Sequence, residues 1–201
     1  MLRQLAKPEV QEMYETISID TVGIAWDLCE QFIAVQNNVD SVGDIPYGKG
    51  WKMLSKEFSD ALRKITMLGY GMIIIAHSKT RIEMIDDEHS IEIVEPDIPP
   101  RAYKAVNQLV DIIGYIGVEF DEDGKSKRTL YTRSTPTLMA GSRFPHLPTK
   151  IPFGYKELTD ALVRAIELSG SRDGAVIVDK DQLQENIIPN RLFKEVSNDS
   201  V

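Results

Sequence analysis

Two short apolar segments, each followed directly by a polar side chain, constrain the fold of this 201-residue chain more than any other feature. Residues 15–20 are apolar and β-rich and end in Asp20, while the later segment "MIIIA" is followed by His77 and Ser78. Continuous apolar runs of this length are typical of parallel strands that are covered on both faces. They predict two such strands, with Asp20 and His77 emerging at the same edge of one sheet.

Two helical patterns lie between these segments. Residues 22–35 and 51–68 each place their apolar residues on one helix face, and Gly69 ends the second helix. The order strand, helix, loop, helix, strand favours an α/β fold with parallel pairing. The predicted buried stripe of the first helix is Val22, Ala25, Trp26, Cys29, Phe32 and Ile33.

The second half of the chain has a different character. Residues 78–100 are polar and acidic and are interpreted as a loop or a weak hairpin, followed by a helix over residues 101–110. Residues 119–133 predict an antiparallel hairpin that turns at Asp123-Gly124 and adds strands at a sheet edge. A last helix is expected over residues 156–168. These patterns predict a core over residues 1–168 and a tail over residues 169–201.

Composition favours a cytoplasmic protein that does not cross a membrane. The single cysteine, Cys29, cannot form an internal disulfide and is expected to be a core thiol. No apolar run approaches the length of about 18 residues that a membrane span requires, and the first residues lack the pattern of a signal peptide. The net charge of -8 means that binding to nucleic acid would require a local basic patch.

The two strand ends have two possible chemical roles. A carboxylate at the position of Asp20 can hold Mg²⁺ in a nucleotide site, but an Asp at a strand end can also cap the following helix. His77 could address a phosphate or a water molecule, or it could be a histidine satisfied at a strand terminus. Two parallel strands that end in such residues favour a functional site.

A phosphate-binding loop of the pattern G-x-x-x-x-G-K-[ST] is not found in the sequence. The nearest segment, "EFDEDGKS", has Gly124, Lys125 and Ser126 in place, but Glu119 stands at the first glycine position. Three acids precede Gly124, and a strand pattern rather than a helix follows the segment, so no helix N-terminus would face an anion. We interpret it as a hairpin turn.

Three segments together resemble the phage-type RecA-like P-loop ATPases, an AAA-family group associated with single-strand DNA annealing and recombination. They are "YETISIDTVGIAWDLCEQF", "GDIPYGKGWKMLSKEFSDALRKITMLGYGMIIIAHSK" and "VDIIGYIGVEFDEDGKSKRTLYTR". The resemblance implies a RecA-like core with ATP and Mg²⁺ as cofactors. Family members carry their phosphate-binding loop upstream of the acidic strand, where this chain has only nineteen residues and no glycine. We therefore expect a core truncated at its N-terminus.

The resemblance also assigns roles to single residues. Asp20 is expected to be the Walker B acid and metal ligand, and His77 the polar sensor after the next core strand, so both are catalytic candidates. Thr21 and Ser78 are expected to accompany Asp20 in cofactor binding. In such sheets the phosphate-loop strand is expected between the acidic strand and the sensor strand, so its absence here would remove a central strand.

The expected partners are a second copy of the chain and single-stranded DNA. Lys127 and Arg128 are candidates to reach across a subunit interface to a neighbour's nucleotide, or else to pair across the hairpin with Glu119 and Asp121. The acidic segment before Pro100 argues against strong DNA affinity. Two functions stay open: an ATP-binding protein of phage DNA recombination, annealing or replication in the host cytoplasm, and a non-catalytic oligomerisation module derived from that fold. Whether the chain is an enzyme depends on the missing loop.

Overall fold

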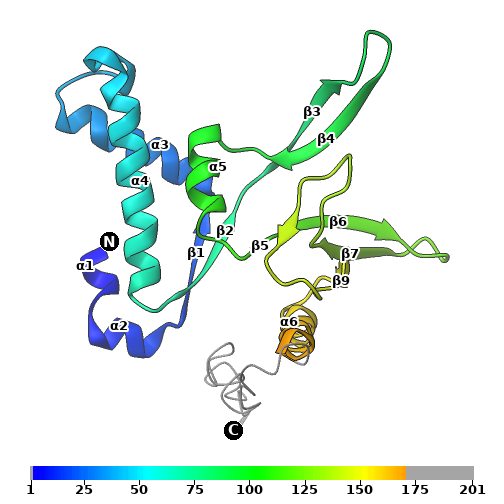
Figure 1. The fold of residues 1–201 in the computed structure, drawn as a ribbon. Coiled ribbons are helices and arrows are strands. Elements are labelled where there is room, and N and C mark those ends of the chain that lie inside the picture. The colour runs from blue at the N-terminus through cyan, green and yellow to red at the C-terminus, as the bar shows by residue number, and fades with distance from the viewer. Residues whose placement is uncertain (1, 171–201) are drawn as a thin grey trace, which may run out of the picture. The chain divides into compact units, whose positions relative to one another are not determined.

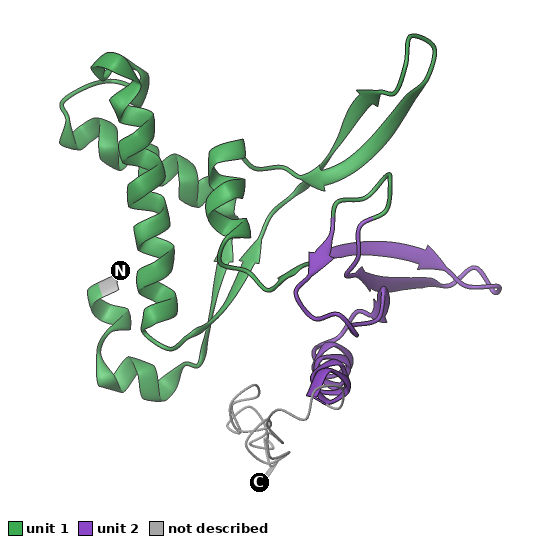
Figure 2. Cartoon of the chain, in the orientation of Figure 1, with its two compact units in different colours: residues 1–113, 135–139 green, residues 114–134, 140–201 purple. Residues whose placement is uncertain are grey.

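A computed structural model describes residues 2–170 of the chain. It divides the chain into two compact units, which Figure 2 shows in green and purple. Unit 1 contains residues 1–113 and 135–139, and unit 2 contains residues 114–134 and 140–201. The prediction of one core over residues 1–168 stays a prediction. The predicted tail lies outside the described residues from residue 171 onward.

Unit 1 contains the parallel strand pair that the sequence predicts. Strands β1 (Thr16–Asp20) and β2 (Gly71–Ile75) pair in parallel, with Ile17 opposite Met72 and Asp20 opposite Ile75. They are joined through helices α3 (Val22–Gln36) and α4 (Lys49–Met67), which appear in blue and cyan in Figure 1. Two short 3-10 turns, η1 (Val42–Asp44) and η2 (Pro46–Gly48), lie between the helices. The predicted α/β class with parallel pairing is confirmed.

The helices and the inner face of β1–β2 enclose the hydrophobic core of unit 1. Trp26 of α3 meets Phe58 of α4 edge to face, with 5.1 Å between the ring centroids. Cys29 packs against this core as predicted, and its burial raises the pKa of its thiol to about 11. The buried members of the core are Val22, Trp26, Ile33, Val42, Ile45, Leu54, Phe58, Leu62, Ile98, Ala102, Ala105 and Val106.

The core covers fewer residues of α3, β1 and β2 than the sequence suggests. Phe32, predicted in the buried stripe of α3, is 47% exposed, and Ala34 is buried in the same helix. The prediction that both strands are buried on two faces is also wrong. Alternate residues of β1 and β2 are exposed, including Ile73 at 53% and Ile75 at 40%, because the core lies on one face of the pair.

The expected place of the absent strand is wrong as well. The resemblance puts the phosphate-loop strand, which is not found in this sequence, between the acidic strand and the sensor strand, but β1 and β2 are hydrogen-bonded neighbours over all five residue pairs. Their main-chain groups satisfy each other directly, so these two strands leave no gap for a central strand. A further strand of this sheet could pair only with the outer edge of β1 or of β2.

The acidic segment after β2 forms a regular antiparallel hairpin. Strand β3 (Ser78–Met84) pairs with β4 (Ser90–Pro96) along its full length, from Ser78 opposite Pro96 to Met84 opposite Ser90. Of the two alternatives from the sequence, the hairpin is therefore correct. Helix α5 (Pro100–Asn107) follows and packs its alanines into the core. Two short helices precede β1 in the chain, α1 (Leu2–Leu5) and α2 (Pro8–Met13).

Unit 2 is built on a three-stranded antiparallel sheet with the order β6-β7-β9. Leu130 of β7 and Ile151 of β9 lie opposite each other and are both buried, and helix α6 packs against β9. Two short strands, β5 in unit 1 and β8 in unit 2, complete the described elements. Their bounds are β5 (Ile112–Ile113), β6 (Tyr115–Phe120), β7 (Ser126–Tyr131), β8 (Gly141–Ser142), β9 (Lys150–Pro152) and α6 (Tyr155–Gly170).

The predicted hairpin is confirmed, with its turn displaced by one residue. Glu122 and Asp123 are the central residues of the turn, because the amide of Gly124 donates to the carbonyl of Asp121 at 2.9 Å. Gly124 follows with φ +75°, a left-handed conformation that glycine adopts without steric cost. The Asp-Gly pair thus marks the end of the turn rather than its centre.

Candidate functional site

The two predicted site residues emerge at the same edge of the parallel sheet. Asp20 is the last residue of β1 and lies opposite Ile75, and His77 follows two residues after Ile75. Because β1 and β2 run in parallel, both chains leave the sheet at the carboxyl ends of their strands. The predicted geometry is confirmed, and the catalytic and cofactor-binding roles of these residues stay predictions.

Asp20 does not cap the following helix. The N-cap of α3 is Thr21, whose side chain makes no capping hydrogen bond. Asp20 is exposed, and within the described residues no side-chain hydrogen bond or ion pair engages its carboxylate. The alternative of a purely structural carboxylate therefore has no contact to support it here, and Asp20 is free to accept a ligand.

His77 and Ser78 begin the segment that leads into the β3–β4 hairpin. Both side chains are exposed, and the carbonyl of His77 accepts a hydrogen bond of 2.7 Å from the amide of Asp97. This main-chain bond ties the end of the hairpin back to its beginning. The His77 main chain is thus anchored, while its ring has no hydrogen-bond partner within residues 2–170.

Asp97 is a further acidic residue at this edge, which the sequence interpretation missed. Its carboxylate lies 3.4 Å from Nζ of Lys79, and its carbonyl oxygen lies 4.0 Å from the position a Cβ on Gly23 would occupy. Asp97 therefore lies next to the start of α3, and α3 begins directly after Asp20 and Thr21. The signal that could have found it is its position, since it directly follows a strand and precedes Pro99 and Pro100.

The residues at this edge fit one half of a magnesium–nucleotide site. Mg²⁺ in such sites is held by one or two carboxylates together with substrate phosphates, and the exposed, unengaged Asp20 suits that role. Within residues 2–170 no group of three or more His, Cys, Asp or Glu side chains could hold a metal without other ligands. In the part of the chain that the structure describes, no glycine-rich loop supplies the amides that would hold the phosphates. The residues at this edge suit the binding of Mg²⁺, but they do not supply the amides that a triphosphate requires.

The "DGKS" turn cannot serve as that loop in this conformation. The amide of Lys125 donates to Oδ1 of Asp121 at 2.7 Å, and the amide of Gly124 donates to the Asp121 carbonyl. Both amides already donate to Asp121, one to its carboxylate and one to its main-chain carbonyl, so neither is available to a phosphate. This contact gives a physical reason for the interpretation of the segment as a turn.

The two candidate trans-acting cations lie on the hairpin of unit 2. Lys127 is opposite Glu119 and Arg128 is opposite Val118, so the two side chains point to opposite faces of the sheet, as predicted. Glu119 is engaged by Lys150 of β9, with 2.6 Å between Nζ and the carboxylate oxygen. Lys127 and Arg128 are exposed and form no ion pair within the described residues. The alternative of a cross-strand ion pair is not observed for either.

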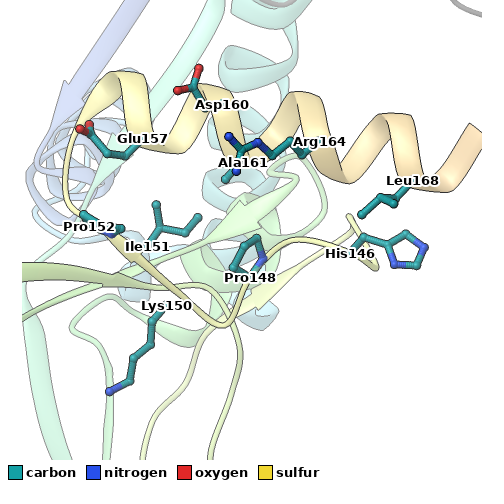
Figure 3. A pocket seen from close by; sticks show the side chains of 10 residues that line it. All are labelled: His146, Pro148, Lys150, Ile151, Pro152, Glu157, Asp160, Ala161, Arg164 and Leu168. Carbon is teal, nitrogen blue, oxygen red and sulfur yellow. The ribbon is translucent and has the colours of Figure 1, made fainter.

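The pocket in Figure 3 lies in unit 2, between β9 and α6, and not at the edge that carries Asp20. It has a volume of about 410 Å³. Two of its charged side chains are occupied elsewhere, since Lys150 binds Glu119 and Asp160 binds Lys156. Its lining residues are His146, Pro148, Lys150, Ile151, Pro152, Glu157, Asp160, Ala161, Arg164 and Leu168.

Comparison with known proteins places the chain in a class. Residues 2–144, more than half of the chain, match the family described as AAA domain, and the chain belongs to this family. This match confirms the predicted resemblance to AAA-family proteins. No solved structure matches the chain.

A prophage-derived relative narrows the context. The chain is 28% identical over 190 residues to the SPbeta prophage-derived uncharacterized protein YorG of Bacillus subtilis (strain 168). The alignment covers 92% of this chain and 56% of the relative, so the chain spans about half the length of the curated relative it matches. The phage character of the resemblance is thereby supported. Among residues 2–170, no helix has the length and apolar character needed to cross a membrane.

Proposed function

We propose that this chain supplies the metal-side half of an ATP site in an AAA-family protein of phage DNA recombination, single-strand annealing or replication. Asp20 holds Mg²⁺, Thr21 and Ser78 contact the bound nucleotide or its metal, and His77 senses the terminal phosphate or the attacking water. The phosphate-binding loop comes from polypeptide outside this chain. The complete site, rather than this chain alone, hydrolyses ATP.

One observation carries this proposal. Asp20 and His77 leave adjacent parallel strands at the same edge, and neither side chain is engaged by another described residue. Exposed polar side chains at the carboxyl ends of parallel strands are where α/β proteins bind ligands. Membership in the AAA domain family supports a nucleotide as that ligand.

The proposal includes a cytoplasmic setting in the host, homo-oligomeric assembly and weak, assisted binding of single-stranded DNA. The β3–β4 hairpin supports weak binding of DNA, because Lys79 and Arg81 both form ion pairs with acidic side chains. Lys79 contacts Asp97 and Glu95, and Arg81 contacts Glu83 and Glu95. In the assembly, Lys127 and Arg128 are free to approach the nucleotide of a neighbouring subunit.

The test compares the chain with the same reading frame extended upstream of Met1. We expect the extended protein to bind and hydrolyse ATP with Mg²⁺. Asp20→Asn should lower its hydrolysis by a factor of about 10² or more, since it removes charge stabilisation at the metal, worth several kcal/mol. His77→Gln should lower hydrolysis while nucleotide affinity changes little.

Asp27→Asn is the matched control, because Asp27 is also an exposed acid but lies within α3 rather than at the end of a strand. It should leave hydrolysis unchanged. An extended protein that hydrolyses ATP equally well with Asp20→Asn would refute the role of Asp20.

The alternative is a non-catalytic oligomerisation module. The observation that favours it is the exposed apolar edge strand of unit 2, where Val118 is 60% and Phe120 is 73% exposed. An upstream frame without a phosphate-binding loop, together with self-association of the chain, would favour this module over the ATP site.

A further inference from the structure

We propose that strand β6 is a self-association edge, where two copies of the chain pair antiparallel about a two-fold axis at Val118. This inference does not rest on the proposed ATP site, because it concerns unit 2 alone. Within the described residues β6 pairs only with β7, so its outer edge has no strand partner. Three of its side chains, Ile116, Val118 and Phe120, are 48%, 60% and 73% exposed.

The hydrogen bonds of the sheet show which main-chain groups of β6 point outward. The amide of Phe153 donates to the carbonyl of Arg128 at 3.0 Å, and the amide of Thr132 donates to the carbonyl of Thr149 at 3.0 Å. The even-numbered residues of β7 therefore direct their main chain toward β9, and the odd-numbered residues toward β6. Because odd-numbered residues lie opposite each other in β6–β7, the even-numbered residues of β6 point outward.

The outward-pointing residues are thus the same ones that carry the exposed apolar side chains. Ile116, Val118 and Phe120 each offer an N–H and a C=O at the open edge. Pairing at this edge would satisfy the backbone and extend the apolar face of the sheet at the same time.

Of the three symmetric registers centred at residues 117, 118 and 119, one matches the side chains along the strand. A two-fold axis at Glu119 would place two carboxylates directly opposite each other, which destabilises the pair. An axis at Gly117 would place Phe120 opposite Gly114, which has no side chain to contact. An axis at Val118 places Ile116 opposite Phe120 of the second copy and Glu119 opposite Gly117 of the second copy.

The charge of Glu119 does not protect the edge in this register. Its carboxylate accepts hydrogen bonds from Lys150, Tyr131 and Thr129 of its own sheet. It lies on the opposite face from Val118, because successive residues of a strand alternate. The strand also lacks a proline, which is a common means of blocking an edge.

The contact is small, and this sets the expected affinity. A pair of six-residue strands buries well under the ~1,200 Å² of a stable interface, so we expect a dissociation constant of about 10⁻⁵ to 10⁻³ M. Sedimentation velocity on the full chain across this range should show a monomer–dimer equilibrium. A chain that stays monomeric at the highest concentration would overturn the proposal.

Two variants distinguish main-chain pairing at β6 from nonspecific hydrophobic association. Val118→Pro removes the central outward N–H, and proline is tolerated on an edge strand whose N–H faces solvent. Val118→Glu places two carboxylates together at the axis, while Arg128 lies across the strand to accept the new charge in the monomer. Each should weaken dimerisation at least about tenfold. Circular dichroism of each variant should match the wild type.

Ile82→Glu is the matched control, because Ile82 is a 65% exposed apolar residue on a strand of the other hairpin. It should leave the equilibrium unchanged. A dimer that survives both Val118 variants, or is lost only with Ile82→Glu, would overturn the assignment to β6.

Cysteine cross-linking tests the register itself. In the proposed pairing the two Val118 Cα atoms are about 5.5 Å apart, within the span of a disulfide, whereas the two Phe120 Cα atoms are separated by about four residues, or ~13 Å. In a Cys29→Ala background, Val118→Cys should form a disulfide-linked dimer on mild oxidation and Phe120→Cys should not. Cross-linking at Phe120 in preference to Val118 would refute this register.

Discussion

The parallel sheet of unit 1 and the antiparallel sheet of unit 2 treat their acidic residues in opposite ways. Asp20, at the end of β1, is exposed and has no described partner. Glu119, in the middle of β6, is held by Lys150, Tyr131 and Thr129 at 2.6, 2.6 and 3.0 Å. A carboxylate whose hydrogen bonds come from its own sheet is structural, whereas one that the fold leaves unengaged is available to a ligand. The difference distinguishes the candidate site from a structural cluster.

The same contrast appears in how the two units are stabilised. Unit 1 has a continuous apolar core around Trp26 and Phe58, and its sheet edge contributes little to that core. Unit 2 combines a small buried centre at Leu130 and Ile151 with a network of polar cross-strand contacts. Changes at Phe58, Glu119 and the exposed cations should therefore have different effects.

The largest expected effect is on nucleotide binding at the unengaged edge. A phosphate cradle supplies charge-assisted hydrogen bonds worth ~1.5–3 kcal/mol each, so lacking two or three costs roughly 3–9 kcal/mol. Relative to a micromolar site, this chain alone should bind ATP with Mg²⁺ weaker by a factor of about 10² to 10⁶ and hydrolyse it negligibly.

Isothermal titration with ATP and Mg²⁺ on the purified chain measures this, with Asp20→Ala as the control. Micromolar binding that disappears in Asp20→Ala would contradict the prediction. It would mean that the edge of unit 1 forms a complete site without the missing loop.

The next effect should fall on the core of unit 1. Phe58 is 3% exposed and contacts Trp26, so Phe58→Ala should lower the free energy of unfolding of unit 1 by about 3–5 kcal/mol. Both tryptophans of the chain, Trp26 and Trp51, lie in unit 1, so tryptophan emission during urea denaturation reports on this unit.

Phe120→Ala is the matched control for this prediction. Phe120 is 73% exposed in unit 2, and at low protein concentration its removal should change stability by less than about 0.5 kcal/mol. Equal effects of the two changes would mean that the difference between the two units is not as described.

A smaller, pH-dependent effect is expected at Glu119. The hydrogen bond from Lys150, followed by those from Tyr131 and Thr129, lowers the pKa of Glu119 from 4.5 to about 2. The folded-state pKa lies below the ordinary value, so ionised Glu119 stabilises the hairpin above pH 4.5 and this contribution is lost as the pH falls toward 2.

Hydrogen exchange of the β6–β7 amides between pH 5 and pH 2 can test this, after correction for intrinsic exchange rates. The wild-type hairpin should lose protection over this interval, and Glu119→Gln should start with lower protection and lose less. Glu122→Gln, in the exposed turn, is the control and should follow the wild type. An unchanged pH profile in Glu119→Gln would contradict the proposed network.

The comparison also shows what the sequence could predict. Local patterns determined the helices and strands, because the apolar spacing of α4 and the runs "TISID" and "MIIIA" require no knowledge of distant residues. The same patterns placed Asp20 and His77 at one edge, since parallel strands end together. The direct pairing of β1 with β2 is a long-range property, and the expectation that the absent phosphate-loop strand belongs between them came from resemblance alone.

Partners distant in the sequence were the main omission. Lys150 binds Glu119 across 31 residues, and the sequence around Lys150 is rich in Pro and Gly, which gave no strand signal for β9. The Asp97 carbonyl lies beside Gly23 at the start of α3, a contact between residues distant in the chain that no spacing rule predicts. The stripe predicted for α3 was wrong at Phe32, because the helix also carries apolar residues outside that stripe, among them the exposed Ile24, Leu28 and Val35, and such a helix does not indicate which side the core will cover.

The smallest expected effect separates the two lysines near Glu119. Lys127 lies directly opposite Glu119 in the hairpin, but Lys150 is the residue that binds it. Lys127→Ala should therefore change the free energy of unfolding by less than about 0.5 kcal/mol, as is usual for an exposed side chain without a specific contact. Lys150→Met keeps most of the side-chain volume and removes the charge, so it should raise the pKa of Glu119 and shift the pH profile of the hairpin. Hydrogen exchange of the β6–β7 amides in the two variants measures both effects. A larger loss of protection with Lys127→Ala than with Lys150→Met would show that the cross-strand neighbour, and not β9, holds the carboxylate, and Lys127 would then be unavailable to a neighbouring subunit.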